Sequence, residues 1–161
     1  MRLTDLNDMH RDDFLTALGW IFEHSPWVAE RAWAARPFPT VDALHAALVA
    51  QVEAATRDEQ LALLRAHPDL GTRARMSTAS QTEQSGAGLH SLTPDDLARL
   101  AAYRNHFGFP FLYAVKGSTT TDIRRALDRR SHNSPDDEFQ EALRQVYRIG
   151  RFRLESISAE T

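Results

Sequence analysis

The chain has 161 residues, of which 42% are hydrophobic and 25% are charged, a composition typical of one soluble globular domain. A net charge of −3 gives no electrostatic reason to expect nucleic acid or an anionic membrane surface as a partner. The absence of cysteine excludes disulfides and thiolate chemistry. The polar start MRLTDLNDMHRDD is not a signal peptide and no apolar run is long enough to cross a bilayer, so we expect a cytoplasmic protein.

Helix signals follow one another through the first half of the chain. Apolar residues recur at helical spacing, and residues that favour helix starts, such as Ser25-Pro26 and Thr40, stand before them. The residue before a proline disfavours helical geometry, so Pro68 ends the last of these helices. The four predicted helices cover residues 11–24, the stretch from Ser25-Pro26 to before Arg36, a stretch beginning after Thr40, and about Arg57–His67.

The second half carries the same kinds of signal. The start Thr93-Pro94 combines a capping residue with proline, and Ser134-Pro135 repeats it. Four helices are predicted here. The first covers Ser80–Gln84 and is ended by Gly86 and Gly88, and the second runs from Thr93 to Gly108. The third covers roughly residues 118–130, and the fourth runs from Ser134 to about Ser158. No repeat or linker divides the chain. We therefore predict an all-α fold, a single compact domain of about eight helices over residues 1–161.

One segment, residues 109–115 (FPFLYAV), does not fit a helix. Its aromatic and apolar residues favour a strand, but no other part of the chain has the alternation of a partner strand. We therefore expect a buried extended segment between helices. Its backbone N–H and C=O groups need partners, and either a polar ligand or loop backbone and water could supply them.

A small polar site is predicted around His67. This histidine ends an apolar helix, and about sixteen residues later Ser80, Glu83 and Gln84 follow at spacings of three and one, which places them on one helix face. The alternative is that these three residues form an ordinary solvated helix surface. None of the seven histidines lies in a ligand pattern such as His-Glu-x-x-His, so we expect no metal.

Arg153 is the most informative charged residue. It falls within a stripe of the last predicted helix that Phe139, Val146, Gly150 and Ile157 direct toward the core. A guanidinium on such a stripe is costly unless it meets a carboxylate or an anionic ligand. An internal ion pair and a bound ligand are equally compatible with this position.

Short landmarks distributed along nearly the whole chain resemble a known family, 2-oxo-4-hydroxy-4-carboxy-5-ureidoimidazoline (OHCU) decarboxylase. Each landmark is short, but their combination in this order, within one chain of this length, is specific for the family. The landmarks are Glu23-His24-Ser25-Pro26-Trp27, Arg36-Pro37-Phe38, His67-Pro68-Asp69-Leu70, Ser80-x-x-Glu83-Gln84, Gly86-Ala87-Gly88-Leu89, Phe107-Gly108-Phe109-Pro110-Phe111 and Arg153-Leu154.

The resemblance implies an all-helical, generally dimeric enzyme that uses no metal or organic cofactor. It implies decarboxylation of OHCU to (S)-allantoin in urate degradation, with a possible functional association with urate oxidase and 5-hydroxyisourate hydrolase. No nucleic acid or membrane partner is expected. The residues that match the family's catalytic positions are His67 and Glu83, and those that match its substrate-binding positions are Pro68, Ser80, Gln84, Phe111, Leu112 and Arg153.

The chain also departs from the family pattern. The stretch over residues 71–79 is shorter than usual, His90 replaces a common Asp, and Leu100 replaces a common Asn. These departures keep open a diverged enzyme that acts on a related ureido compound. A helical binding module without activity is the competing class, and it predicts that substitutions of His67 and Glu83 are tolerated.

Overall fold

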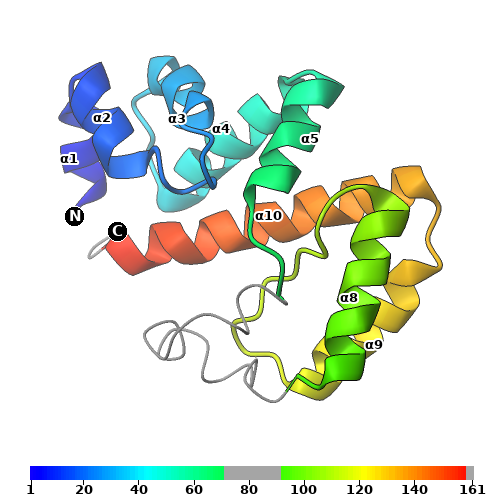
Figure 1. Ribbon diagram of the computed structural model, residues 1–161. Coiled ribbons are helices and arrows are strands. Elements are labelled where there is room, and N and C mark those ends of the chain that lie inside the picture. The colour runs from blue at the N-terminus through cyan, green and yellow to red at the C-terminus, as the bar shows by residue number, and fades with distance from the viewer. Residues whose placement is uncertain (71–91, 159–161) are drawn as a thin grey trace. The chain divides into compact units, whose positions relative to one another are not determined.

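The computed structural model describes residues 1–70 and 92–158, and it confirms the predicted all-α fold over these ranges (Figure 1). The described residues form eight α-helices and one short 3-10 helix. The helix predicted over Ser80–Gln84 lies outside them. The elements are α1 (Leu3–Asp8), α2 (Arg11–Leu18), α3 (Trp27–Ala32), η1 (Trp33–Ala35), α4 (Val41–Ala54), α5 (Arg57–Ala66), α8 (Pro94–Phe107), α9 (Thr120–Ser131) and α10 (Pro135–Ile157).

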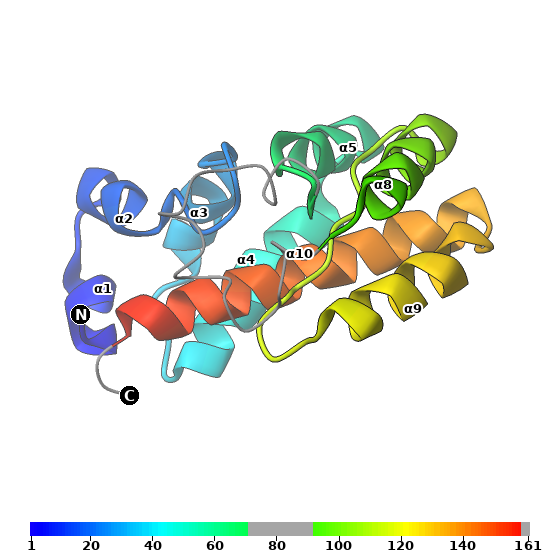
Figure 2. The same cartoon turned by 60° about the horizontal axis from the view of Figure 1, so that its bottom comes forward.

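The chain divides into two compact units, and the long helix α10 contributes to each. The first unit is Met1–Ala66 with Tyr147–Thr161, and the second is His67–Val146. In the first unit α3 packs against α2 and α4, and the amino group of Met1 donates to the carbonyl of Ile157 at 3.1 Å (Figure 2). In the second unit α8 packs beside α9.

The predicted helix starts are confirmed where threonine precedes a helix. The side chains of Thr40, Thr93 and Thr119 each accept a hydrogen bond from a backbone N–H in the first turn of α4, α8 and α9. Helix α8 ends at Gly108, whose φ of +85° is a left-handed conformation that glycine adopts without a steric penalty. Local sequence therefore sets these boundaries.

The predicted helix over residues 11–24 is wrong in its second half. Helix α2 ends at Leu18, and Gly19 turns the chain with its N–H 2.7 Å from the Leu15 carbonyl oxygen. A Cβ at residue 19 would lie 2.5 Å from that same oxygen, so only glycine fits this turn. His24 therefore does not lie in a helix, and its φ of +48° is left-handed. Ile21 and Phe22 are buried as expected, but as parts of the turn that follows α2.

The buried side chain of Asp96 joins the start of α8 to α9. Its Oδ2 accepts from the backbone N–H of Thr93 at 2.8 Å and from Nη2 of Arg124 at 2.8 Å, while Arg124 Nε donates to Oδ1 at 3.0 Å. The Arg124 guanidinium, assisted by the Thr93 backbone, lowers the pKa of Asp96 from 3.8 to about 2. The carboxylate is therefore a stabilising group in its ionised form.

Replacing Asp96 with asparagine is expected to lower the free energy of unfolding at pH 7 by about 1–2 kcal/mol, because a charged hydrogen-bond acceptor is lost. A carboxylate whose folded-state pKa is lowered stabilises above its unfolded value, and this stabilisation is lost as the pH falls toward about 2. Urea unfolding at pH 7 and near pH 2.5 should show the difference from the parent protein shrinking in acid. The exposed neighbour Asp95 offers the matched variant Asp95→Asn. A difference that is equal at the two pH values would contradict the assignment.

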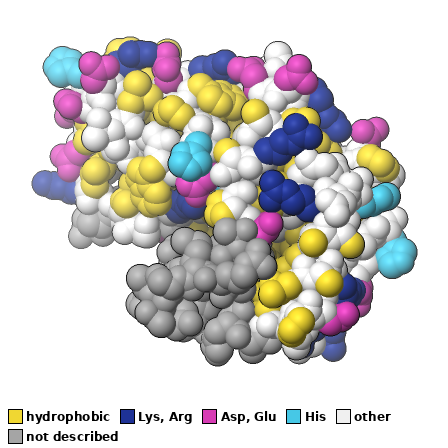
Figure 3. Space-filling view, in the orientation of Figure 1, with side chains coloured by type: hydrophobic (Ala, Val, Ile, Leu, Met, Phe, Trp, Pro, Cys, Tyr) yellow, Lys and Arg dark blue, Asp and Glu magenta, His cyan; other side chains and the backbone are white. Residues whose placement is uncertain are grey.

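Charged side chains of opposite sign share the visible surface. In Figure 3, Lys and Arg side chains are interspersed with Asp and Glu side chains over the face that the view presents. In the described residues 1–70 and 92–158, no helix is both long and apolar enough to cross a membrane.

Candidate active site

His67 is the first residue of the second unit and follows directly after Ala66, the end of α5. The helix ends within one residue of the predicted position, as Pro68 requires. His67 is only 4% exposed, so its imidazole is enclosed by protein. An imidazole changes its protonation state near neutral pH and is therefore the side chain best suited to move a proton to or from a ligand.

One of the residues that follow His67 contacts α8. Asp69 forms an ion pair with Arg104, with Oδ2 and Nη1 3.2 Å apart, and Leu70 is buried. Arg104 is half exposed, so this ion pair contributes little to stability by itself. It does show that Asp69, two residues beyond the imidazole, lies against α8.

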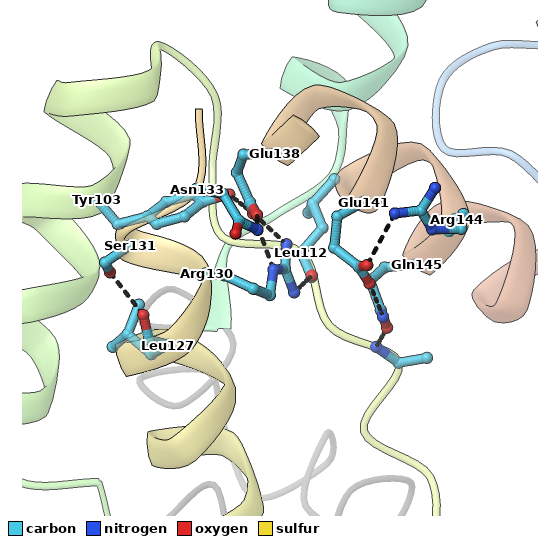
Figure 4. A network of polar contacts seen from close by, with 11 residues as sticks. Tyr103, Leu112, Leu127, Arg130, Ser131, Asn133, Glu138, Glu141, Arg144 and Gln145 are labelled. Carbon is cyan, nitrogen blue, oxygen red and sulfur yellow. Dashed lines mark hydrogen bonds and ion pairs between the residues drawn. The ribbon is translucent and has the colours of Figure 1, made fainter. Parts of the chain in front are cut away.

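The segment over residues 109–115 is buried, as predicted, and residues 110–115 contain neither helix nor strand. Two of its backbone groups have side-chain partners, which neither of the predicted alternatives included. The carbonyl of Leu112 accepts from Nη1 of Arg130 at 2.8 Å, and the N–H of Ala114 donates to Oε1 of Gln145 at 3.0 Å (Figure 4). At these two positions the protein itself satisfies the backbone.

Arg130 belongs to a fully buried ion pair. Its Nε and Nη2 lie 2.8 and 2.7 Å from Oε2 of Glu138, and both side chains have no exposed surface. Tyr103 donates its hydroxyl to the same carboxylate, and Asn133 donates to Oε1 of Glu138 at 3.1 Å. Burial raises the pKa of Tyr103 far above its usual range, which keeps this hydroxyl protonated as a donor. The network therefore links α8, α9 and α10 around one carboxylate (Figure 4).

Arg153 has internal partners in the first unit. Its Nη2 lies 3.1 Å from Oε1 of Glu23, and its Nη1 donates to the carbonyls of Trp20 and Ile21 at 3.1 Å each. The side chain retains 24% exposure. The structure therefore shows the internal ion pair that the sequence left as one of two alternatives. The ligand-binding role of Arg153 stays a prediction.

The other predicted site residues are placed as follows. Pro68, Phe111 and Leu112 lie in the second unit with His67, whereas Ser80, Glu83 and Gln84 lie outside the described residues. Within residues 1–70 and 92–158, no three His, Asp or Glu side chains gather in a way that could hold a metal ion. Of the two predicted catalytic residues, the structure describes only the buried His67, and its role in proton transfer stays a prediction.

Comparison with known proteins shows the family of this chain. The family model for OHCU decarboxylase matches residues 7–155. The chain belongs to the OHCU decarboxylase family. It is 47% identical over 165 residues to the OHCU decarboxylase of Haloferax volcanii, covering 99% of this chain and 98% of that relative. It is 44% identical to the uric acid degradation bifunctional protein PucL of Bacillus subtilis, covering 98% of this chain but 33% of PucL.

A solved crystal structure is also similar to this chain over nearly its whole length. The crystal structure of (S)-allantoin synthase has a TM-score of 0.75 and 34% identity, and it covers 97% of this chain. This chain spans about half of that one, at 53% of its length. Membership of the OHCU decarboxylase family makes this chain a carboxy-lyase rather than the competing binding module.

The sequence did not predict the hydrogen-bond network of Arg130 and Glu138 that supports residues 109–115. One signal was available, because Arg130 follows Ile123, Ala126 and Leu127 at spacings of seven, four and three and so shares their buried face of α9. Glu138 is one of three acidic residues in the first turn of α10, where acidic residues are favoured by the helix dipole. Its burial could therefore not be predicted from the sequence.

Proposed function

We propose that this protein catalyses the decarboxylation of OHCU to (S)-allantoin in urate degradation, using its own side chains and no metal or organic cofactor. The observation that carries the proposal is the 47% identity to the H. volcanii OHCU decarboxylase over 98% of that relative's length. A second relative named OHCU decarboxylase, from Halalkalicoccus jeotgali, is 43% identical over 93% of its length.

The chemistry of OHCU suits such a protein. Its carboxylate is attached to a ring carbon that also bears a hydroxyl and lies next to unsaturated ring atoms. When the C–C bond to CO2 breaks, the electron pair is delocalised into the ring, so no separate electron sink is needed. The hydroxyl-bearing carbon then becomes the ring carbonyl and gives up its hydroxyl proton. The neighbouring ring carbon, which bears the ureido arm, takes up a proton, and delivery to one face yields a single enantiomer. The enzyme has to orient the ring, stabilise the developing charge and supply that proton.

We assign His67 as the acid and base near the hydroxyl and the departing carboxylate. Its burial supports this role, because interactions between an imidazole and a charged substrate are stronger where water is excluded. Glu83 and Gln84, assisted by Ser80, hold the ureido arm, which offers N–H donors and a carbonyl acceptor. Pro68 and the backbone of Phe111 and Leu112 line the substrate site.

We assign Arg153 to the ring or ureido oxygens rather than to the departing carboxylate. A tight grip on that carboxylate would stabilise the ground state and slow its loss. The ion pair with Glu23 supports this assignment, because it already balances part of the guanidinium charge. We also propose that the protein is a cytoplasmic homodimer that works with urate oxidase and 5-hydroxyisourate hydrolase. The association with urate degradation is supported by the name of PucL, a bifunctional uric acid degradation protein.

Circular dichroism tests the activity directly. Urate is oxidised in the presence of a hydroxyisourate hydrolase, with and without this protein. OHCU decays spontaneously to racemic allantoin, so only enzymatic decarboxylation leaves a lasting optical signal. We expect a fast rise to the (S)-allantoin signal in the presence of the protein. A folded sample whose trace matches the protein-free control would overturn the proposed function.

A further inference from the structure

The segment over residues 109–115 is fixed through its backbone rather than only through its side chains. Hydrogen bonds engage the carbonyl of Leu112 and the N–H of Ala114, one on each side of Tyr113. Their partners, Arg130 and Gln145, come from two different helices, α9 and α10 (Figure 4). The two bonds therefore set the position of the backbone between these residues.

Each of these partners is itself held by a second side chain. The buried carboxylate of Glu138 holds Arg130. Gln145 donates its Nε2 to Oε2 of Glu141 at 2.8 Å. Gln145 therefore accepts from the segment with one end of its amide and is oriented through the other. Such a chain leaves little freedom for the segment to shift.

The side chain of Phe111 is unsuited to direct contact with a polar substrate. It has no exposed surface, its ring lies 4.3 Å from the guanidinium carbon of Arg130, and the ring of Tyr103 meets it edge-on with centroids 5.1 Å apart. Since the Leu112 carbonyl and the Ala114 N–H already have protein partners, substrate binding by this segment falls to its other backbone groups. Those groups can be aligned only if the backbone is held.

We propose that Gln145 and Arg130 are positioning residues for the reaction, which place the backbone of residues 111–114 against the substrate. The inference rests on the proposed function. A binding group that is out of position weakens substrate binding, so loss of one of these bonds raises KM in addition to any effect on stability.

Gln145 provides the sharper test, because the Glu138 network also supports the core. The variant Gln145→Met keeps the length of the side chain and its place in the helix but removes both hydrogen bonds. OHCU is generated in the assay from varied urate by excess upstream enzymes. We expect KM to rise by about tenfold with kcat changed by less than about threefold, because uniform binding is lost. Partial unfolding alone lowers the apparent kcat and leaves KM unchanged.

Two further variants complete the design. Arg144→Ala removes the exposed hydrogen bond to Glu141 but keeps the hydrogen bond between the Ala114 N–H and Gln145, so KM is expected to stay at the parental value. The double variant Glu141→Gln, Gln145→Glu exchanges donor and acceptor and retains an oxygen for the Ala114 N–H, so it should restore KM to within about threefold. If Gln145→Met does not fold, Gln145→Asn replaces it, because its amide is one methylene too short to reach Ala114.

The outcomes separate this inference from the proposed function. A folded Gln145 variant with an unchanged KM, or a double variant that does not restore KM, overturns the positioning role. An inactive parent protein instead overturns the proposed function. Hydrogen exchange of residues 109–115 provides a readout that needs no substrate, and Gln145→Met should speed exchange there and not in α3 or α4.

Discussion

The variant His67→Ala is expected to lower kcat/KM for OHCU decarboxylation by at least about 100-fold while the protein remains folded, because a positioned acid and base contributes about 10²–10⁴ to a rate. His67 directly follows α5, and alanine keeps the backbone N–H and C=O groups at this position, so we expect the helix to form as before. The circular dichroism assay measures the rate, and the far-ultraviolet spectrum of the same sample reports the helix content.

A second histidine offers the matched control. His45 is also partly buried and has its Nε2 2.8 Å from the carbonyl oxygen of Tyr147, but it lies in α4 and in no part of the proposed site. His45→Ala is expected to cost stability and to leave kcat/KM of the folded fraction within about twofold, since surface and support positions act through folding. Equal activity in the parent and His67→Ala proteins would remove His67 from the mechanism.

The variant Arg130→Met is expected to lower the free energy of unfolding by about 3–5 kcal/mol, because it leaves the Glu138 carboxylate buried without its countercharge. The ion pair has no exposed surface on either side chain, so solvent cannot compensate for the loss. The carbonyl of Leu112 loses its donor in the same variant. Urea unfolding at pH 7 measures the change.

Removing the second charge should reverse much of this effect. In Arg130→Met, Glu138→Leu no buried charge remains, and well-packed apolar replacements of a buried pair are often close to neutral. We expect the double variant to be more stable than Arg130→Met by about 2 kcal/mol, although Tyr103 and Leu112 still lack their partners. The exposed neighbour Arg129 gives the control Arg129→Ala, which should change stability by less than about 0.5 kcal/mol. A loss below about 1 kcal/mol in Arg130→Met would show that the pair is not a major support of the fold.

The helix starts could be predicted because their signals are local. The hydroxyl of Thr93 meets a backbone N–H only three residues away, so a short stretch of sequence contains the whole interaction. The end of α2 could not be predicted in this way, because apolar spacing continues through Ile21 and Phe22 although the chain turns at Gly19. Helix α1 was not predicted, since Leu6 is its one buried residue and no apolar stripe marks it.

The candidate site shows the same division between local and distant interactions. The position of His67 follows from Pro68, its neighbour in the chain, and the structure confirms the end of the helix there. The partner of Arg153 is Glu23, 130 residues earlier, and no spacing rule connects them. The stripe on the last helix therefore predicted that Arg153 needs either a carboxylate or an anionic ligand, but it did not predict Glu23. The partners of Leu112 and Ala114 were missed because they come from helices that only the fold brings together.

The division of α10 between the two units has a consequence for biosynthesis. The second unit is one continuous stretch that ends at Val146, whereas the first unit needs its N-terminal 66 residues together with the stretch from Tyr147 onward, which includes the buried Leu154. A ribosome therefore delivers every residue of the second unit before the first can be completed. We expect this to reverse the usual order, in which the N-terminal part of a chain folds first as it emerges. Until the last turns of α10 emerge, the apolar residues Ile21 and Phe22 lack the neighbour that Gly150 provides, so we expect nascent-chain chaperones to bind longest at these residues.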